Sequence, residues 1–308
     1  MNRRQYLTRA GTGVGALALL AGCLDDFTGS DSSAEVGDRT GERELDRAAG
    51  ALNDAALALD VGGGAIEDPE TLEFDPDEPA GLIADARAHL ETAMDELDEG
   101  RRPDVETLRT YADVLEGLVA VTDTVADEGL ESEAETVFAT IGGDGDIATA
   151  TDTVGERTSK LDEARTEYDE AADDFRTLED RFEELAGIDR TDLESGISTL
   201  STVLDSLETL GSGFESLLAG YDDLERGRAH AEDGADKQAS EAYADAESAF
   251  ETAAATLEGD EDTPAGLTDY FETAICQSDQ LIDAVTAFDD GQQNEGERAL
   301  AAANDCAQ

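Results

Sequence analysis

The sequence predicts an all-α protein of antiparallel helical hairpins, or a bundle, around two long central helices. After residue 42, apolar residues recur at the three- and four-residue spacing of helices. No segment alternates apolar and polar residues for long enough to indicate a strand. Two longer apolar patterns, starting near Ile147 and Leu193, are expected to form the central pair.

Residues 1–22 differ from the rest of the chain and have the features of a signal peptide. They hold three arginines and no acidic residue, and an uncharged run from Gly11 to Gly22 leads to Cys23. That run is too short to cross a bilayer, which needs about 20 residues. A charged start, a short apolar run and small residues before a cut point are typical of a secretory signal.

Two motifs in this segment resemble known export sequences. Arg3-Arg4-Gln5-Tyr6-Leu7 resembles a twin-arginine export signal, in which Arg3 and Arg4 are the paired arginines. Leu20-Ala21-Gly22-Cys23 resembles the lipobox of bacterial and archaeal lipoproteins. The resemblance implies cleavage before Cys23, a lipid on its thiol, and a location on the outer face of the cell membrane. It covers only the first 23 residues.

The strongly acidic composition of the chain limits the kinds of partner that it can bind. The formal net charge is -57, and removing residues 1–22 leaves -60. Nucleic acid is therefore excluded as a partner, because its phosphates need Lys and Arg. The composition resembles that of exported proteins of salt-loving archaea, where molar salt screens self-repulsion. Most of the acids are accordingly interpreted as a solvated coat. Disorder is the alternative, but the apolar residues are regularly spaced.

The predicted organisation after the signal is a lipid-anchored flexible tether, residues 23–41, followed by an acidic helical domain, residues 42–308. The tether is rich in Gly, Ser and Asp and lacks periodicity. The domain has a candidate subdivision into 42–141 and 146–308. In its first part the apolar spacing predicts helices over about 42–59, 79–98, 103–125 and 131–140.

The second part opens with a heptad pattern typical of a coiled coil. Apolar residues recur every seven positions from Ile147 to Phe182, with Arg157 breaking the companion series. This predicts one helix of about 40 residues ending at Gly187. Thr191 and Glu194 predict a capping box for the next helix, which has three apolar rows. The two long helices are expected to pair as an antiparallel hairpin, with other helices covering the remaining face.

Near the C-terminus, one stretch resembles a tetratricopeptide repeat, with small, ring and turn residues at that family's offsets. The matching residues are Gly227, His230, Gly234, Ala239, Tyr243 and Ala246. The following hairpin keeps little of the pattern, and an array needs about three units. Ordinary packing of Ala-rich helices remains the alternative.

Cys276 and Cys306 are predicted to form a disulfide. They lie equidistant from a polar turn centred on Gly291, so an antiparallel hairpin brings them together. An exported chain meets an oxidising compartment, and lipidation of Cys23 leaves these two thiols. Two unrelated buried thiols are the alternative.

The sequence contains no recognisable catalytic set. His89 and His230 are far apart, and His89 is interpreted as a surface partner of Asp85. The loop 142–146 lacks the glycine and closing glutamate of a calcium loop. We therefore expect a non-enzymatic binding or scaffold module with no cofactor or metal, anchored to the membrane through Cys23. It is expected to have a protein partner of unknown identity. The alternatives are the solute-binding component of a transporter and, less favoured, a metal-dependent enzyme.

Overall fold

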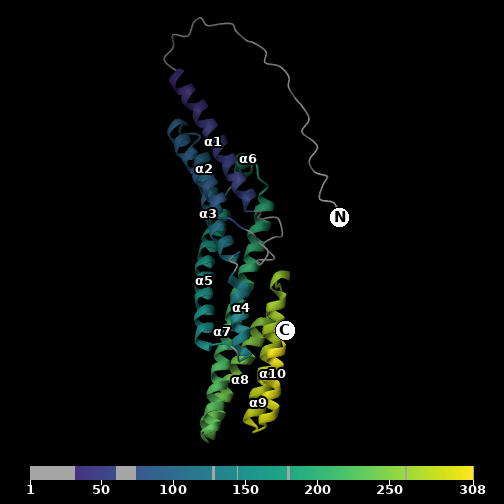
Figure 1. Cartoon of the computed structure of the whole chain (residues 1–308). Helices are drawn as coiled ribbons and strands as arrows, with labels where there is room; N and C mark the ends of the chain where they lie inside the picture. Colours follow the sequence, from purple (N-terminus) through teal and green to yellow (C-terminus); the bar gives the residue numbers. More distant parts are fainter. Residues whose placement is uncertain are drawn as a thin grey trace, which may run out of the picture.

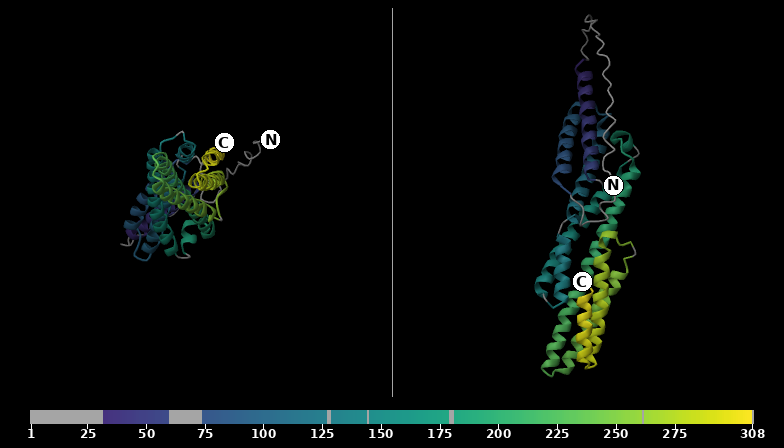
Figure 2. Two further views of the ribbon diagram at one scale, coloured as in Figure 1. Left: turned by 90° about the horizontal axis from the view of Figure 1, so that it is seen from below. Right: turned by 45° about the vertical axis from the view of Figure 1, so that its right-hand side comes forward.

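The computed structural model describes residues 32–59, 74–126, 129–143, 145–178, 181–260 and 262–307. Within these ranges every regular element is helical, which confirms the all-α fold class. The helices form an elongated rod with a compact cross-section (Figures 1 and 2). The predicted signal peptide, with Arg3 and Arg4, and the predicted lipid site at Cys23 lie outside the described residues.

Three helices lie side by side at one end of the rod: α1 (Ser32–Ala58), α2 (Asp77–Glu96) and α3 (Arg102–Val125). Their apolar faces are buried as the spacing predicted. Arg101, in the α2–α3 turn, lies 3.3 Å from Glu42 of α1. This ion pair fixes the α2–α3 turn beside the N-terminal part of α1.

Helix α1 begins ten residues earlier than predicted, so the expected tether 23–41 is wrong in its second half. The helix continues through Gly41, which is buried where α1 crosses the end of α2. A Cβ atom at Gly41 would lie 2.6 Å from the Leu97 Cγ. Gly41 therefore permits a close helix contact, whereas in the sequence it resembles a linker glycine.

The heptad segment forms two helices instead of one, so the predicted 40-residue helix is wrong beyond Thr177. Helix α5 (Ile147–Thr177) ends there, and the short α6 (Arg181–Ala186) packs against α1 and α3. Arg190 accounts for the break. Its guanidinium donates to the carbonyls of Leu178 (2.5 Å) and Phe175 (3.3 Å). Arg190 thus satisfies carbonyls that the next helical turn would otherwise pair.

The buried face of α5 contacts three helices, mainly α3 and α7 and to a smaller extent α4 (Gly129–Ile141), so it does not form a simple two-stranded hairpin. On α3, Gly117 lies under Ala171 of α5, and a Cβ at Gly117 would be 2.8 Å from the Ala171 Cβ. Small residues in the heptad pattern therefore bring α5 close to α3 as well as to α7. Arg157, the exception in the pattern, is buried and lies 3.9 Å from Glu133 of α4.

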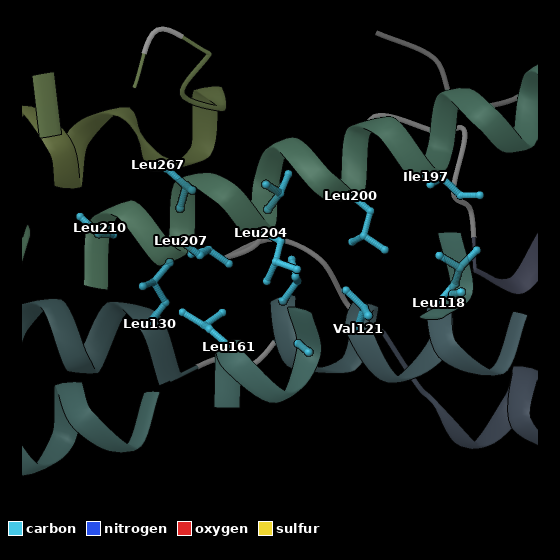
Figure 3. Close-up of a cluster of buried hydrophobic side chains, with 14 of the residues drawn as sticks. Leu118, Val121, Leu130, Leu161, Ile197, Leu200, Leu204, Leu207, Leu210 and Leu267 are labelled. Carbon is cyan, nitrogen blue, oxygen red and sulfur yellow. The ribbon is translucent and has the colours of Figure 1, made fainter. Parts of the chain in front are cut away.

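Helix α7 (Arg190–Glu232) is the spine of the rod and, at 43 residues, is about 65 Å long. Its three predicted apolar rows are all buried, which confirms that several helices cover it. Figure 3 shows Leu200, Leu204 and Leu207 of α7 facing side chains of its neighbours. The predicted capping box is wrong: Asp189 caps α7 by accepting from the Thr191 N–H, and Glu194 pairs with Arg190.

The far end of the rod holds α8 (Asp236–Glu258), α9 (Thr268–Asp289) and α10 (Gln293–Asp305). Gly234 and Gly291 adopt positive φ in the turns before α8 and α10. The ring of Tyr243 packs on Gly227, and Ala239 and Ala246 are buried. These contacts are common to a tetratricopeptide-like hairpin and to ordinary helix packing.

One hydrophobic core runs along the molecule and contains buried residues from Leu45 to Ala303. Helices α5 and α7 lie lengthwise in it and connect α3 at one end with α8 at the other. The predicted parts 42–141 and 146–308 therefore share a core.

Candidate functional site

Cys276 and Cys306 are joined by a disulfide in the structure. Their Cα atoms are 6.0 Å apart, within the usual range for a bridge. Cys276 is exposed on α9, and Cys306 follows the last residue of α10, one position beyond the helix in which it was expected. Because α10 itself buries only Gly296 and Ala303, the bridge is a major part of what holds this helix to α9.

Replacing both bridge cysteines with serine is expected to lower the free energy of unfolding by about 3–4 kcal/mol, because the bridge closes a loop of about 30 residues. Hydrogen exchange should rise most in α10, and denaturant unfolding in molar salt gives the magnitude. Thiol labelling of the unreduced, denatured mature domain is the check: labelling at both positions would show that the bridge is absent.

A buried carboxylate connects three helices near the α1 end of the rod. Asp104 of α3 is 0% exposed. It accepts a 2.6 Å hydrogen bond from the Nε of Arg101, and the Nη2 of Arg181 on α6 lies 2.5 Å away. This hydrogen bond is the main reason that the pKa of Arg101 is raised. The same Arg101 reaches Glu42, so charge pairs link α1, α3 and α6.

A surface groove of about 330 Å³ runs between α2 and α3. Ile83 and Val119, both buried, form its floor, and Arg87 and Glu116 form part of its rim. Arg87 donates to Glu116 and to Asp113, and the hydrogen bond to Glu116 is the main cause of its raised pKa. Arg87 engages Glu116 at this rim, and the apolar floor between charged side chains gives the groove the character of a contact surface.

The two histidines lie on different helices and do not form a common site. The Nδ1 of His89 lies 2.7 Å from Glu44 of α1, so its expected pairing with Asp85 is wrong. The interhelical packing of α1 on α2 brings Glu44 closer. His230 lies in the last turn of α7. In the described ranges, no three His, Cys, Asp or Glu side chains converge as metal ligands.

In the loop before α5, Asp146 caps the helix. Its carboxylate accepts from the backbone N–H (2.9 Å) and the hydroxyl (2.8 Å) of Thr149. These two bonds lower the pKa of Asp146, the hydroxyl contributing most. An N-cap role accounts for this acid without a bound cation.

Sequence reasoning missed Asp104 and Arg190, the two residues that organise the α1 end. A signal for Asp104 existed: it stands four residues before Leu108, in line with the apolar face of α3. For Arg190 there was none, because its partners Phe175 and Leu178 lie in the last turn and at the C-cap of α5, on the other side of α6 in the sequence.

Each helix in the part of the chain that the structure describes is too short or too polar to cross a membrane. No protein-family model matches the chain, and no match was found among the curated proteins or the solved structures.

Proposed function

We propose that the mature chain is a lipid-anchored, non-enzymatic helical module that binds or holds another protein on the outer face of the membrane in a cell adapted to high salt. The observation that carries the proposal is the lipobox-like sequence ending at Cys23, eight residues before α1 begins. Such a short link ties an anchor to one end of a long helical rod.

The chemistry of the surface is consistent with this role. Exposed or part-exposed arginines such as Arg87, Arg165 and Arg190 are engaged by carboxylates of the same chain. The groove between α2 and α3 has an apolar floor with a charged rim, which is the usual composition of a modest protein contact. A role in binding uses these features directly, whereas a catalytic role would need groups that act on a substrate.

The change Cys23→Ser is expected to release the mature chain from membranes or to block its processing, since the thiol that would carry the lipid is lost. Membrane fractionation and mass spectrometry of the N-terminal peptide measure both effects. The matched control is the Cys276→Ser/Cys306→Ser variant, which should stay membrane-bound with a lipid on Cys23.

A Cys23→Ser chain that is cut normally and stays in the membrane fraction would contradict the anchor. The binding role is examined on the same cells by chemical crosslinking: the wild-type chain should be recovered joined to a protein of another sequence. Recovery of the chain alone, at a crosslinker dose that joins other surface proteins, would contradict it.

A further inference from the structure

We propose that the mature chain is held end-on to the lipid surface, with the α7–α8 and α9–α10 turns farthest from it. The inference rests on the proposed lipid on Cys23 and adds the orientation of the rod.

Helix α1 begins at one end of the rod (Figure 1). The N-terminal part of α1, the α2–α3 turn and α6 lie at one end of the rod, and the turns before α8 and α10 lie at the other (Figures 1 and 2). Contacts agree with this arrangement: Glu42 pairs with Arg101, and Arg101 shares Asp104 with Arg181 of α6. Helix α7 alone separates the two ends by about 65 Å.

The link between Cys23 and α1 is short. Eight residues, 24–31, stand between Cys23 and the first residue of α1. A chain spans at most about 3.3–3.6 Å per residue, so these eight reach less than about 30 Å. The lipid is therefore confined to the α1 end, since a link of that length falls far short of the opposite turns.

A rod tied at one end lies flat only if its side attracts lipid. The charge and the apolar exposure of the flank therefore decide the orientation. Along the flank, several arginines are already paired with carboxylates of the same chain. Arg165 bonds Glu208 and also contacts Asp205, and Arg226 pairs with Asp222 and Asp223. Leu57 is the exposed large apolar side chain of the described ranges, and one leucine makes no apolar patch.

Net charge acts in the same direction as these local contacts. The mature chain carries a formal charge of -60. In molar salt this repulsion acts only at contact, over about 3 Å; at that range a flank lying on anionic head groups would place like charges together, whereas the upright arrangement leaves only one end near them.

At the end that then faces away from the lipid, ring stacking and ring–glycine contacts hold the helices together. The rings of Tyr243 (α8) and Phe288 (α9) stack with centroids 6.2 Å apart. Gly227 of α7 lies under Tyr243, and Gly296 of α10 lies under Phe288. Helices α7, α8, α9 and α10 are thus packed together at the same level of the rod, near the α7–α8 and α9–α10 turns. This end is therefore preformed and faces away from the lipid.

Neutron reflectometry on a supported bilayer containing anionic lipid tests the orientation, using the mature lipidated protein in molar salt. The end-on arrangement predicts a protein layer thicker than about 65 Å, whereas a rod lying flat gives two or three helix diameters, about 20–30 Å. In a variant with 20 Gly/Ser residues inserted after Gly29, the protein layer should move away from the lipid, because the longer link no longer holds the α1 end at the surface.

The possible failures are distinguishable. Mature protein without a lipid on Cys23, and with no layer on the bilayer, would overturn the proposed anchor itself. Lipidated protein that forms a thin layer would overturn the end-on orientation and leave the anchor standing. An insertion variant whose layer stays in contact with the lipid would also overturn it, because the flank would then be binding the surface.

Discussion

Transfer of the mature chain from molar salt to dilute buffer is expected to unfold most of its helices. At 1 M ionic strength the Debye length is about 3 Å, and at 0.01 M it is about 30 Å, so the repulsion among the -60 net charges becomes unscreened. Helix α5 illustrates the local problem: Asp169 and Asp173 are both exposed and stand one turn apart, as do Glu163 and Glu167. Far-UV circular dichroism over a KCl series measures the loss.

Two variants test whether electrostatic interactions are the cause of the salt requirement. Replacing Glu163 with Gln and Asp169 with Asn should lower the salt concentration needed for folding, because each change removes repulsion on α5. Replacing Glu208 with Gln should raise it, because Glu208 bonds Arg165 across α5 and α7, the main cause of the raised pKa of Arg165. Sucrose at matched osmolality should restore less helicity than KCl, because it favours the compact state by exclusion from the surface but does not screen charge. Full helicity in salt-free buffer would refute the salt requirement.

The double substitution Arg101→Met/Arg181→Met is expected to cost about 3–5 kcal/mol of unfolding free energy, since it leaves the buried carboxylate of Asp104 without its cations. The single change Asp104→Ala should cost less. Its two arginines are 38% and 49% exposed and can turn to water once the carboxylate is gone. Denaturant unfolding in molar salt measures each value.

The triple variant is the decisive comparison. Adding Asp104→Ala to the double arginine variant should recover stability, because the uncompensated buried charge is removed. The matched control is Arg176→Met, whose partner Asp173 is 76% exposed, and which should cost less than about 1 kcal/mol. A triple variant that is less stable than the double variant would show that the burial of Asp104 is not what makes the cluster costly to break.

Local periodicity accounts for much of what was predictable. Rows such as Leu193, Leu200 and Leu207 predicted a long helix covered by several neighbours, and the structure buries them. Glycines after a periodic segment marked turns correctly, since Gly187 and Gly291 both adopt positive φ. The symmetric placement of two cysteines about Gly291 predicted the pairing that the structure has. The export signal, the lipid on Cys23 and the function remain proposals from sequence motifs.

The sequence by itself determined the helical class and which face of each helix is apolar, because both follow from spacing within one segment. Only the tertiary structure decided which helix covers which face. Arg190 bonds the carbonyls at the α5–α6 break, and Gly41 lets α1 pass close to Leu97 at the end of α2. Asn53 holds the end of α6, since its amide donates to the Ala186 carbonyl 133 residues away. Such contacts form between residues remote in sequence, and periodicity within a segment carries no information about them.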